Sequence, residues 1–545
     1  MSTLLSIHNL SVSLPKGADR PYAISNVSLE LNNNEILCIV GESGSGKSMM
    51  SSAIMGLLPE RVKATSGEIL FEGEDLLTYN DAQMRKIRGA RIGMIFQEPM
   101  TALNPLRTIA DQIAEMYWTH TKLKKADINK KVLELLNDVQ IPNPEAAAKA
   151  YPHELSGGQR QRAMIAMALA LEPTVLIADE PTTALDVTTQ AHILKLIRDL
   201  QQRKGTAVLF ITHDFGVVAE IATHVAVIQK GELVEQGSVN DVLNHPTHPY
   251  TQRLIAAVPP LSPSDARLIS QNSILNVNHV TKTYRSGGLF KRNRRITHAV
   301  NDVSFTVPQG GTIGIVGESG SGKSTLARCI IKLLNIDEGQ IEFDNVNIAD
   351  LKGKTLRQYS RNIQMVFQDP YASLNPRKKV GEQVAIGPQL YGMTKQSAME
   401  KAKVLFKLVG LDSEAVHRYP HEFSGGQRQR IGLARALALE PKILVADEPV
   451  SALDVSVQEQ VLQLLAELRE KLGLTLIFIT HDLRVAAQIC DSIIVMKNGN
   501  IVEQGLASQV FTKPQHEYTK SLLDAVPGKN WNPPRLIDMS PAIHI

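Results

Sequence analysis

The chain has 545 residues, of which 21% are charged, and a formal net charge of +3. This length is too great for one hydrophobic core and predicts two domains of about 250 residues each. The nearly balanced charge does not favour a nucleic-acid-binding class. Cys38, Cys329 and Cys490 are scattered along the chain. This spacing argues against a disulfide framework, a zinc site or an iron–sulfur site, and it fits a reducing cytosol.

The N-terminal residues MSTLLSIHNL show no basic stretch followed by an apolar core, so we expect no signal peptide. The longest apolar run, Ala163 to Leu171, is far shorter than the ~20 residues that a membrane-spanning helix needs. We therefore expect that the chain does not itself cross a membrane.

The first motif along the chain is GESGSGKS at residues 41–48, which has the form GxxxxGK[ST] of a P-loop. It follows the apolar run 36–40, which predicts a buried strand, and it precedes 49–55, which predicts a helix. In such a loop the backbone N–H groups turn inward around phosphates, a lysine reaches the β and γ oxygens, and a serine hydroxyl ligates Mg²⁺. The residues expected to bind ATP and Mg²⁺ here are Gly41, Ser43, Gly44, Gly46, Lys47 and Ser48.

The same eight letters return at residues 317–324, again between an apolar run and a helix-like segment. Two complete P-loops in this context favour phosphate binding over the alternative of a purely structural turn. The second set of expected nucleotide-binding residues is Gly317, Ser319, Gly320, Gly322, Lys323, Ser324 and Thr325.

The repetition extends over nearly the whole sequence and indicates duplicated domains. FQEPMTALNP at 96–105 returns as FQDPYASLNP at 367–376, and LIADEPTTALDV at 176–187 returns as LVADEPVSALDV at 444–455. Proline and serine replace the periodic pattern between the copies. We expect a first domain at 1–258, a linker at 259–272 and a second domain at 273–545.

Each half alternates short apolar runs with helix-like segments, which predicts an α/β class with a mainly parallel core sheet in each domain. A helix-like segment at 190–201 places Ile193, Leu194, Ile197 and Leu200 on one face. The predicted buried strands are 174–178, 207–211, 443–446 and 476–479.

Paired acids end one predicted strand of each half, at Asp179–Glu180 and at Asp447–Glu448. Parallel sheets expose ligand groups at such strand ends. The first acid of each pair is expected to hold Mg²⁺, and the second to orient or deprotonate the attacking water. For an isolated Asp-Glu pair a helix N-cap would be the better interpretation, but the upstream P-loops favour the catalytic one.

Two further residue types accompany each pair. His213 and His481 follow the next strand, where an imidazole can bond the γ-phosphate, although a lone histidine there would more often be packed or capping. Gln97 and Gln368 follow aromatic residues at strand ends, and we expect both to contact nucleotide and metal. A lone glutamine would ordinarily lie on the surface.

These motifs together resemble the ATP-binding cassette family, whose domains carry a helical signature subdomain beside the P-loop core. In that family the signature of one domain closes over the nucleotide of the other. The resemblance therefore implies that the two domains pair within one chain, with Lys47 working with Ser424 and Lys323 with Ser156. A serine and small residues at a probable helix start suit an anion-binding surface. The added nucleotide-contacting and interface residues are Ser156, Gly157, Gly158, Gln159, Ser424, Gly425, Gly426, Gln427, Asp186 and Asp454.

A narrower resemblance links the chain to the dipeptide, oligopeptide and nickel importer branch. It rests on the YPHE[LF]SGGQRQR form at 151–162 and 419–430, and on HPTHPYTQRLIAAVP at 245–259 and KPQHEYTKSLLDAVP at 513–527. It implies an ATPase at the cytoplasmic face of the bacterial inner membrane that works with two integral permease subunits and, indirectly, with an extracytoplasmic solute-binding protein. The cargo stays open among peptides, glutathione, a nickel complex and a peptide antibiotic.

The chain departs from this branch in two places. Members can carry a cysteine cluster after the VP turn, and none is present here, so we expect no iron–sulfur cluster. An aromatic residue normally stacks on adenine. Tyr284 fits this role in the second half, but Leu14 stands at the matching place in the first, with Tyr22 as a less certain substitute. We therefore expect weaker adenine binding in the first site.

The rival from another class is a soluble tandem cassette ATPase that acts on ribosomes or nucleic acid. Such proteins usually carry a long charged linker or zinc-binding insertions, and this sequence shows neither. The basic run at 291–295 is better interpreted as a solvated loop than as a phosphate-binding patch. An exporter ATPase is disfavoured by the importer-type ends.

Overall fold

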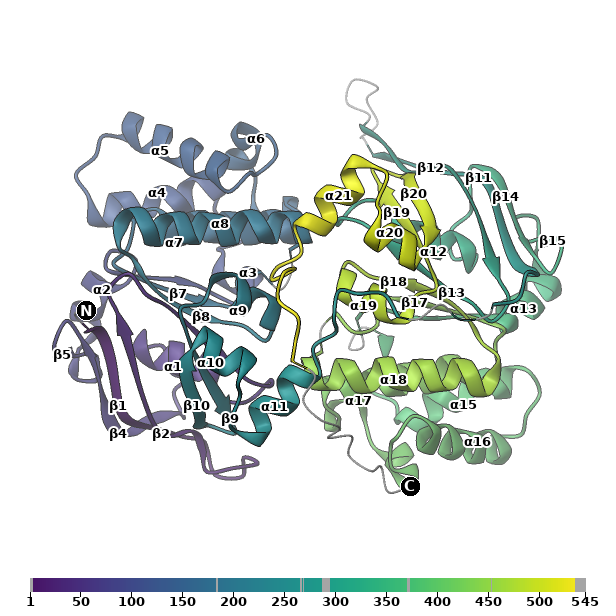
Figure 1. Cartoon of the computed structure of the whole chain (residues 1–545), viewed down its shortest axis with the longest axis horizontal. Helices are drawn as coiled ribbons and strands as arrows, with labels where there is room; N and C mark the ends of the chain where they lie inside the picture. The colour runs from purple at the N-terminus through teal and green to yellow at the C-terminus, as the bar shows by residue number, and fades with distance from the viewer. Residues whose placement is uncertain are drawn as a thin grey trace. The chain divides into compact units, whose positions relative to one another are not determined.

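The computed structural model describes residues 3–182, 185–264, 267, 269–286, 295–369, 373–451 and 453–534. The chain forms two compact units, shown together in Figure 1. The first unit is Met1–Val258 with Ala525–Ile545, and the second unit is Pro259–Asp524. The boundaries expected from the repeated motifs stay a prediction of domain organisation. In space, the segment that starts at Ala525 belongs with the first unit, although it follows the motifs of the second domain in the sequence.

The first unit contains a four-stranded antiparallel sheet in the order β2-β1-β4-β5 and a six-stranded sheet in the order β10-β9-β3-β8-β7-β6. The strands β9, β3, β8, β7 and β6 run parallel, and β10 is antiparallel. The strand bounds are β1 Thr3–Ser13, β2 Tyr22–Asn32, β3 Ile36–Val40, β4 Lys63–Phe71, β5 Glu74–Asp75, β6 Ile92–Ile95, β7 Val175–Asp179, β8 Ala207–Ile211, β9 His224–Gln229 and β10 Glu232–Ser238.

Helices of the first unit follow the strands in alternation, and in Figure 1 α4, α5 and α6 group at one end of this unit. The helix bounds are α1 Lys47–Ile54, α2 Asp81–Ile87, α3 Pro99–Ala102, α4 Ile109–His120, α5 Lys125–Asp138, α6 Pro144–Lys149, α7 Gly157–Leu169, α8 Val187–Lys204, α9 Phe215–Ile221, α10 Val239–Asn244 and α11 Pro249–Ala256.

The second unit repeats both sheets, in the orders β12-β11-β14-β15 and β16-β17-β18-β13-β19-β20. Its strands are β11 Ser273–Ser286, β12 Arg295–Pro308, β13 Thr312–Val316, β14 Glu338–Phe343, β15 Val346–Asn347, β16 Ile363–Val366, β17 Ile443–Asp447, β18 Thr475–Ile479, β19 Ser492–Lys497 and β20 Asn500–Leu506. Its helices are α12 Lys323–Ile330, α13 Gly353–Asn362, α15 Val380–Leu390, α16 Lys395–Leu408, α17 Gly425–Leu437, α18 Val455–Leu472, α19 Leu483–Ile489, α20 Ala507–Thr512 and α21 Glu517–Asp524.

The predicted α/β class is confirmed. Every residue of β3, β7 and β8 is buried, as expected for parallel strands that are covered on both faces. The predicted segment 190–201 lies within α8. Asp186 caps the start of this helix, and the helix ends at Gly205, which has φ 70°. No helix of the described ranges is long and apolar enough to span a bilayer.

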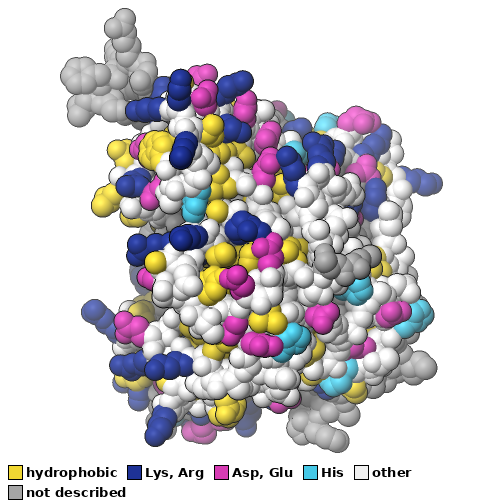
Figure 2. Space-filling view, turned by 90° about the vertical axis from the view of Figure 1, so that its left-hand side faces the viewer, with side chains coloured by type: hydrophobic (Ala, Val, Ile, Leu, Met, Phe, Trp, Pro, Cys, Tyr) yellow, Lys and Arg dark blue, Asp and Glu magenta, His cyan; other side chains and the backbone are white. Residues whose placement is uncertain are grey.

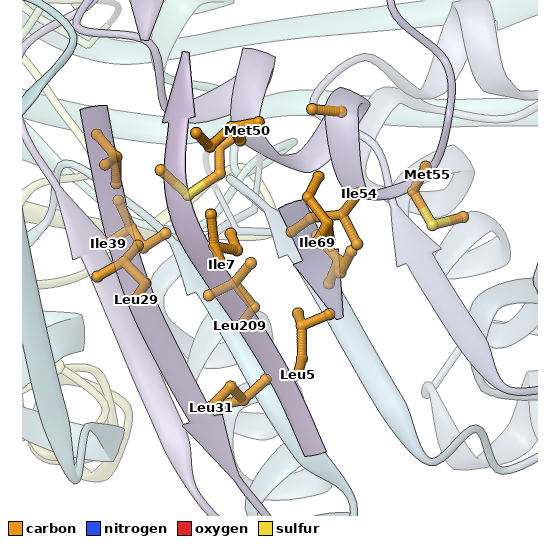
Figure 3. Packing of buried hydrophobic residues seen from close by; sticks show 14 of the residues in the cluster. Leu5, Ile7, Leu29, Leu31, Ile39, Met50, Ile54, Met55, Ile69 and Leu209 are labelled. Atoms are coloured by element: carbon orange, nitrogen blue, oxygen red, sulfur yellow. The ribbon is translucent and has the colours of Figure 1, made fainter. Parts of the chain in front are cut away.

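The core of the first unit lies between its two sheets and α1. Leu5 and Ile7 of β1 pack with Ile39 of β3 and with Met50 and Ile54 of α1 (Figure 3). This cluster holds β3 and the start of α1, which border the P-loop, in fixed positions. An equivalent cluster around Ile313, Ile315 and Leu326 does the same in the second unit.

Candidate active sites

The first P-loop connects β3 to α1 through backbone conformations that favour glycine. Gly46 precedes α1 with φ 109°, and a Cβ there would lie 2.4 Å from the backbone oxygen of Ala23. Gly322 repeats this geometry with φ 104° and a clash at 2.0 Å with the oxygen of Ala299. A side chain at either position would push the loop away from the neighbouring strand, so the close approach requires glycine.

The P-loop lysines are buried and held by the loop itself. The Lys47 Nζ donates to the backbone oxygens of Gly41 at 2.7 Å and Glu42 at 2.9 Å. Lys323 makes the matching bonds to Gly317 and Glu318, both at 2.8 Å. A buried ammonium needs such acceptors. Each lysine is the first residue of a helix, and phosphate oxygens are favourable partners at a helix N-terminus.

A serine hydroxyl and an aspartate meet beside each P-loop. Ser48 donates to Asp179 at 3.1 Å, and Ser324 donates to Asp447 at 3.0 Å. Burial raises the pKa of both carboxyl groups, although the serine hydrogen bonds partly oppose this. One hydroxyl and one carboxylate suit Mg²⁺, which usually keeps several waters and takes its remaining oxygens from substrate phosphates.

The neighbouring glutamates occupy a strained backbone conformation. Glu180 and Glu448 both have φ 47°, a left-handed region that non-glycine residues rarely adopt. Each continues the sheet for one more bond, from the Glu180 N–H to the Ile211 oxygen and from the Glu448 N–H to the Ile479 oxygen, both at 2.9 Å. Backbone strain of this kind clusters at active sites.

Each glutamate receives the predicted glutamine and histidine. The Gln97 Nε2 donates to Glu180 at 3.1 Å, and the His213 Nδ1 lies 3.4 Å from the same carboxylate. Burial alone would raise the pKa of Glu180, but the hydrogen bond and charge of His213 outweigh it and lower the pKa to about 2. Glu180 is therefore an ionised acceptor near neutral pH.

The second unit forms the same cluster. The Gln368 Nε2 donates to Glu448 at 2.8 Å, and the His481 Nδ1 lies 3.2 Å from that carboxylate. The Glu448 pKa is lowered, because the bond and charge of His481 outweigh burial. Burial would lower the pKa of His481, but the hydrogen bond to Glu448 raises it. Both halves thus bring together the residues that the sequence singled out.

Aspartates cap the helices that follow the two cluster histidines. Asp214 and Asp482, and not the neighbouring histidines, cap the helices α9 and α19. Gln97 and Gln368 are exposed, but each bonds a glutamate.

The signature segments begin helices, as expected. Ser156 caps α7 and Ser424 caps α17, each accepting from the glutamine three residues later in a capping box. Asp186 caps α8 by accepting from the Thr189 N–H at 2.9 Å. Each signature is described within its own unit, so the pairing of one unit's signature with the other's P-loop stays a prediction.

The aromatic residues differ between the units. Tyr284 on β11 and Tyr22 on β2 are each 41% exposed, whereas Leu14 packs against the core of the first unit. The side chain of Arg20 donates to the Gly44 oxygen in the first P-loop. Sequence reasoning missed Arg20, because no motif marks it.

Sequence reasoning also missed two tyrosines that contact the P-loops. The Tyr250 hydroxyl accepts from the Glu42 N–H at 3.0 Å, and the Tyr518 hydroxyl accepts from the Glu318 N–H at 3.3 Å. The available signal was the shared pattern of the two extensions, HPTHPYT and KPQHEYT, which repeats the tyrosine at the same place.

Comparisons with known proteins agree with this architecture. The ABC transporter family matches residues 24–183 and 300–451, and the oligopeptide/dipeptide transporter C-terminal region matches residues 234–296 and 502–538. A glutathione import ATP-binding protein of Salmonella choleraesuis is 46% identical over 96% of this chain and 89% of its own length. A peptidoglycan transport ATP-binding protein of Agrobacterium fabrum is 46% identical over 96% of both chains. The chain therefore belongs to the ABC transporter family, as an ATPase with two ATP-binding domains that energises import.

Proposed function

We propose that this chain hydrolyses ATP with Mg²⁺ at two sites to power the import of peptides or peptide-like solutes. The observation that carries the proposal is the intact cluster in each unit, Glu180 with Gln97 and His213, and its twin around Glu448. Glutathione is a tripeptide and peptidoglycan carries short peptides, so the cargo classes in the names of the two relatives share peptide chemistry.

Each cluster suits the hydrolysis of a γ-phosphate. The ionised Glu180 can accept a proton from water or orient it, and His213 and Gln97 hold the carboxylate in place. Lys47 and the P-loop N–H groups would stabilise phosphate charge, and Ser48 with Asp179 would hold Mg²⁺. Negative charge from a bound phosphate would raise the Glu180 pKa toward the range of a useful base.

The two units are proposed to complete one another's sites, with the signature at Ser424 facing the nucleotide at Lys47, and Ser156 facing the nucleotide at Lys323. Support comes from the helix N-termini that both serines cap, since such termini favour phosphate. ATP would then favour closure of the pair, because both faces contact its phosphates, and hydrolysis would favour opening.

Two integral membrane permease subunits are the proposed recipients of this motion, with a solute-binding protein outside the membrane. In the second unit, a hollow of about 730 Å³ is lined by Phe367, Gln368, Leu333 and Ile386, among others. In the first unit, Leu106 is 84% exposed after the matching FQEPMTALNP segment. The hollow beside Gln368 in the second unit and the exposed Leu106 in the first fit contacts with cytoplasmic permease helices, and such contacts would place the chain at the inner face of the membrane.

The nucleic-acid alternative receives no support from the face drawn in Figure 2. On the face in Figure 2, basic and acidic side chains are interspersed with hydrophobic ones, without the continuous basic stripe that phosphate binding requires. The side chains of the basic run at 291–295 lie outside the described residues.

The test is affinity purification of the tagged chain from gently solubilised native membranes, followed by mass spectrometry. Two multispanning proteins that elute with the chain, and whose elution is lost when Leu106 and Phe367 are both changed to aspartate, would support the proposal. Ribosomal proteins or nucleic acid in their place, with no chain in the membrane fraction, would refute it.

A further inference from the structure

The two C-terminal extensions connect the units in a reciprocal way. The chain leaves the first unit after Val258 and returns to it after Asp524. The first extension includes α11 and continues into residues 259–264 of the second unit. The second extension includes α21 and continues into residues 525–534 of the first unit. Each extension therefore starts in its own unit and ends in the other.

Each extension starts on the P-loop of its own unit. Tyr250 of α11 is 3% exposed and Tyr518 of α21 is 7% exposed, and their hydroxyls accept from the Glu42 and Glu318 N–H groups. The Gly41 and Gly317 oxygens, which belong to the same peptide groups as these N–H groups, accept from the P-loop lysines. A change in the P-loop on phosphate binding thus acts directly on the peptide groups that the tyrosines hold.

The second extension ends on the helix that follows the histidine of the first unit. Pro527 and Gly528 are buried against Gly216 in the first turn of α9, and a Cβ on Gly216 would lie 2.6 Å from the Pro527 oxygen. The Gly528 N–H donates to the Glu220 carboxylate at 3.3 Å. Further along, the Trp531 Nε1 donates to Asn244 at 3.2 Å.

The first extension ends at the matching place in the second unit. Arg484, the second residue of α19, donates to the Pro259 oxygen at 3.3 Å. Ser264 bonds the backbone oxygens of Ala487 at 3.0 Å and Gln488 at 2.7 Å. Since Gly216 is the second residue of α9, both extensions contact the same turn, three residues after His213 or His481.

We propose that each extension is a strap that couples the two ATP sites, by linking the P-loop of its own unit to the helix behind the histidine of the other. Tyr250 and Tyr518 are positioning residues at one end, and the turns at Pro259 and Pro527 act at the other. The inference rests on the proposed roles of the glutamate clusters. Coupling of this kind is a free energy shared between two sites, so it is measurable from either end.

The first test measures the strap without catalysis. Trp118 and Trp531 are the two tryptophans of the chain, so Trp118→Phe leaves Trp531 as the only one. In that chain Lys47→Ala disables the first P-loop, and MgATP can load only the second. The strap predicts that MgATP still changes the acrylamide quenching of Trp531, and that Tyr518→Phe abolishes this change. A fluorescent ATP analogue reports that the second P-loop remains loaded. No quenching change, or one that survives Tyr518→Phe, would overturn the proposal.

The second test measures which site depends on the strap. Gly528 has φ 59° and a Cβ there would lie 2.6 Å from the Gly216 oxygen, so Gly528→Val should release the turn and expose Trp531. In a Glu448→Gln chain, where Glu180 supplies the turnover, Gly528→Val should lower kcat by about fivefold with little change in KM. In a Glu180→Gln chain, kcat should stay within about twofold. Asn530→Ala, at an exposed neighbouring position, is the matched control.

The outcomes separate the strap from the proposed roles of the glutamates. Equal losses of kcat in both backgrounds would show general destabilisation and overturn the strap proposal. Unchanged quenching of Trp531 in Gly528→Val would also overturn it. If neither glutamine substitution lowers turnover, the proposed glutamate roles fail, while the quenching test of the strap still stands.

Discussion

Replacing the two cluster glutamates by glutamine should separate the contributions of the two sites. Glu180 accepts from Gln97 at 3.1 Å and lies 3.4 Å from His213, so its carboxylate uses both oxygens. A glutamine keeps the size but has one oxygen and one NH₂ group, and that NH₂ group would face another donor. The change removes the proton acceptor and one of the two bonds at once.

The size of the effect follows from the number of clusters. A positioned general base is worth about 10²–10⁴-fold in rate, so the double variant Glu180→Gln/Glu448→Gln should lose turnover by about that factor. Each single variant removes one of two matching clusters and should at least halve the turnover. A loss well beyond half would mean that the sites act in an obligatory sequence.

Steady-state phosphate release, with ATP binding measured in parallel, is the assay. The variants should still bind ATP, because Lys47 and Lys323 keep their bonds to the Gly41 and Gly317 oxygens of the loops. Asn530→Ala serves as the control for handling of the purified chain. If either single variant hydrolyses ATP at the unsubstituted rate, the two clusters are not equivalent and the proposal of two hydrolysing sites is wrong.

Three further changes test local features. Gly46→Ala forces a Cβ to within 2.4 Å of the Ala23 oxygen at a positive φ, so it should cost about 1–3 kcal/mol of stability and abolish ATP binding at that loop, as judged by unfolding and nucleotide titration. Ser156→Ala removes the cap of α7 and should lower the free energy of unfolding by about 1 kcal/mol in a denaturant titration, and no change would contradict the capping geometry. The pKa of Glu448 is lowered from 4.5, so its contribution to stability is lost as pH falls. The pKa of His481 is raised from 6.5, so its contribution is lost as pH rises. The destabilisation caused by His481→Gln should therefore be largest between pH 4.5 and 6.5, and a flat profile would argue against the ion pair.

The sequence indicated that the P-loop and the acidic pair lie close together, because both follow buried strands. Asp179 ends β7 and the P-loop follows β3, and the carboxyl ends of parallel strands meet at one edge of a sheet. The strain at Glu180 could not be predicted, since a positive φ at a glutamate leaves no trace in composition or periodicity.

Long-range contacts to the P-loop were also beyond the sequence. Tyr250 lies 208 residues from Glu42, and Arg20 lies 24 residues from Gly44 in a segment without periodic pattern. A single sequence shows which residue types occur, but only the packed structure shows that the extension returns to the loop. The difference between Leu14 and Tyr284 was visible in the sequence, and the structure adds that Leu14 is partly buried and packs against the core.

The exchange of extensions offers a physical reason for joining two cassettes in one chain. In the proposed pairing, a short linker makes the association of the two units intramolecular, with an effective concentration on the order of millimolar. The chain here crosses between the units twice, at Val258 and at Asp524, and each crossing has a tyrosine bound to a P-loop on one side and a buried turn on the other. Because each crossing ends on the helix that follows a cluster histidine, the proposed straps are placed to report the state of one P-loop to the other site.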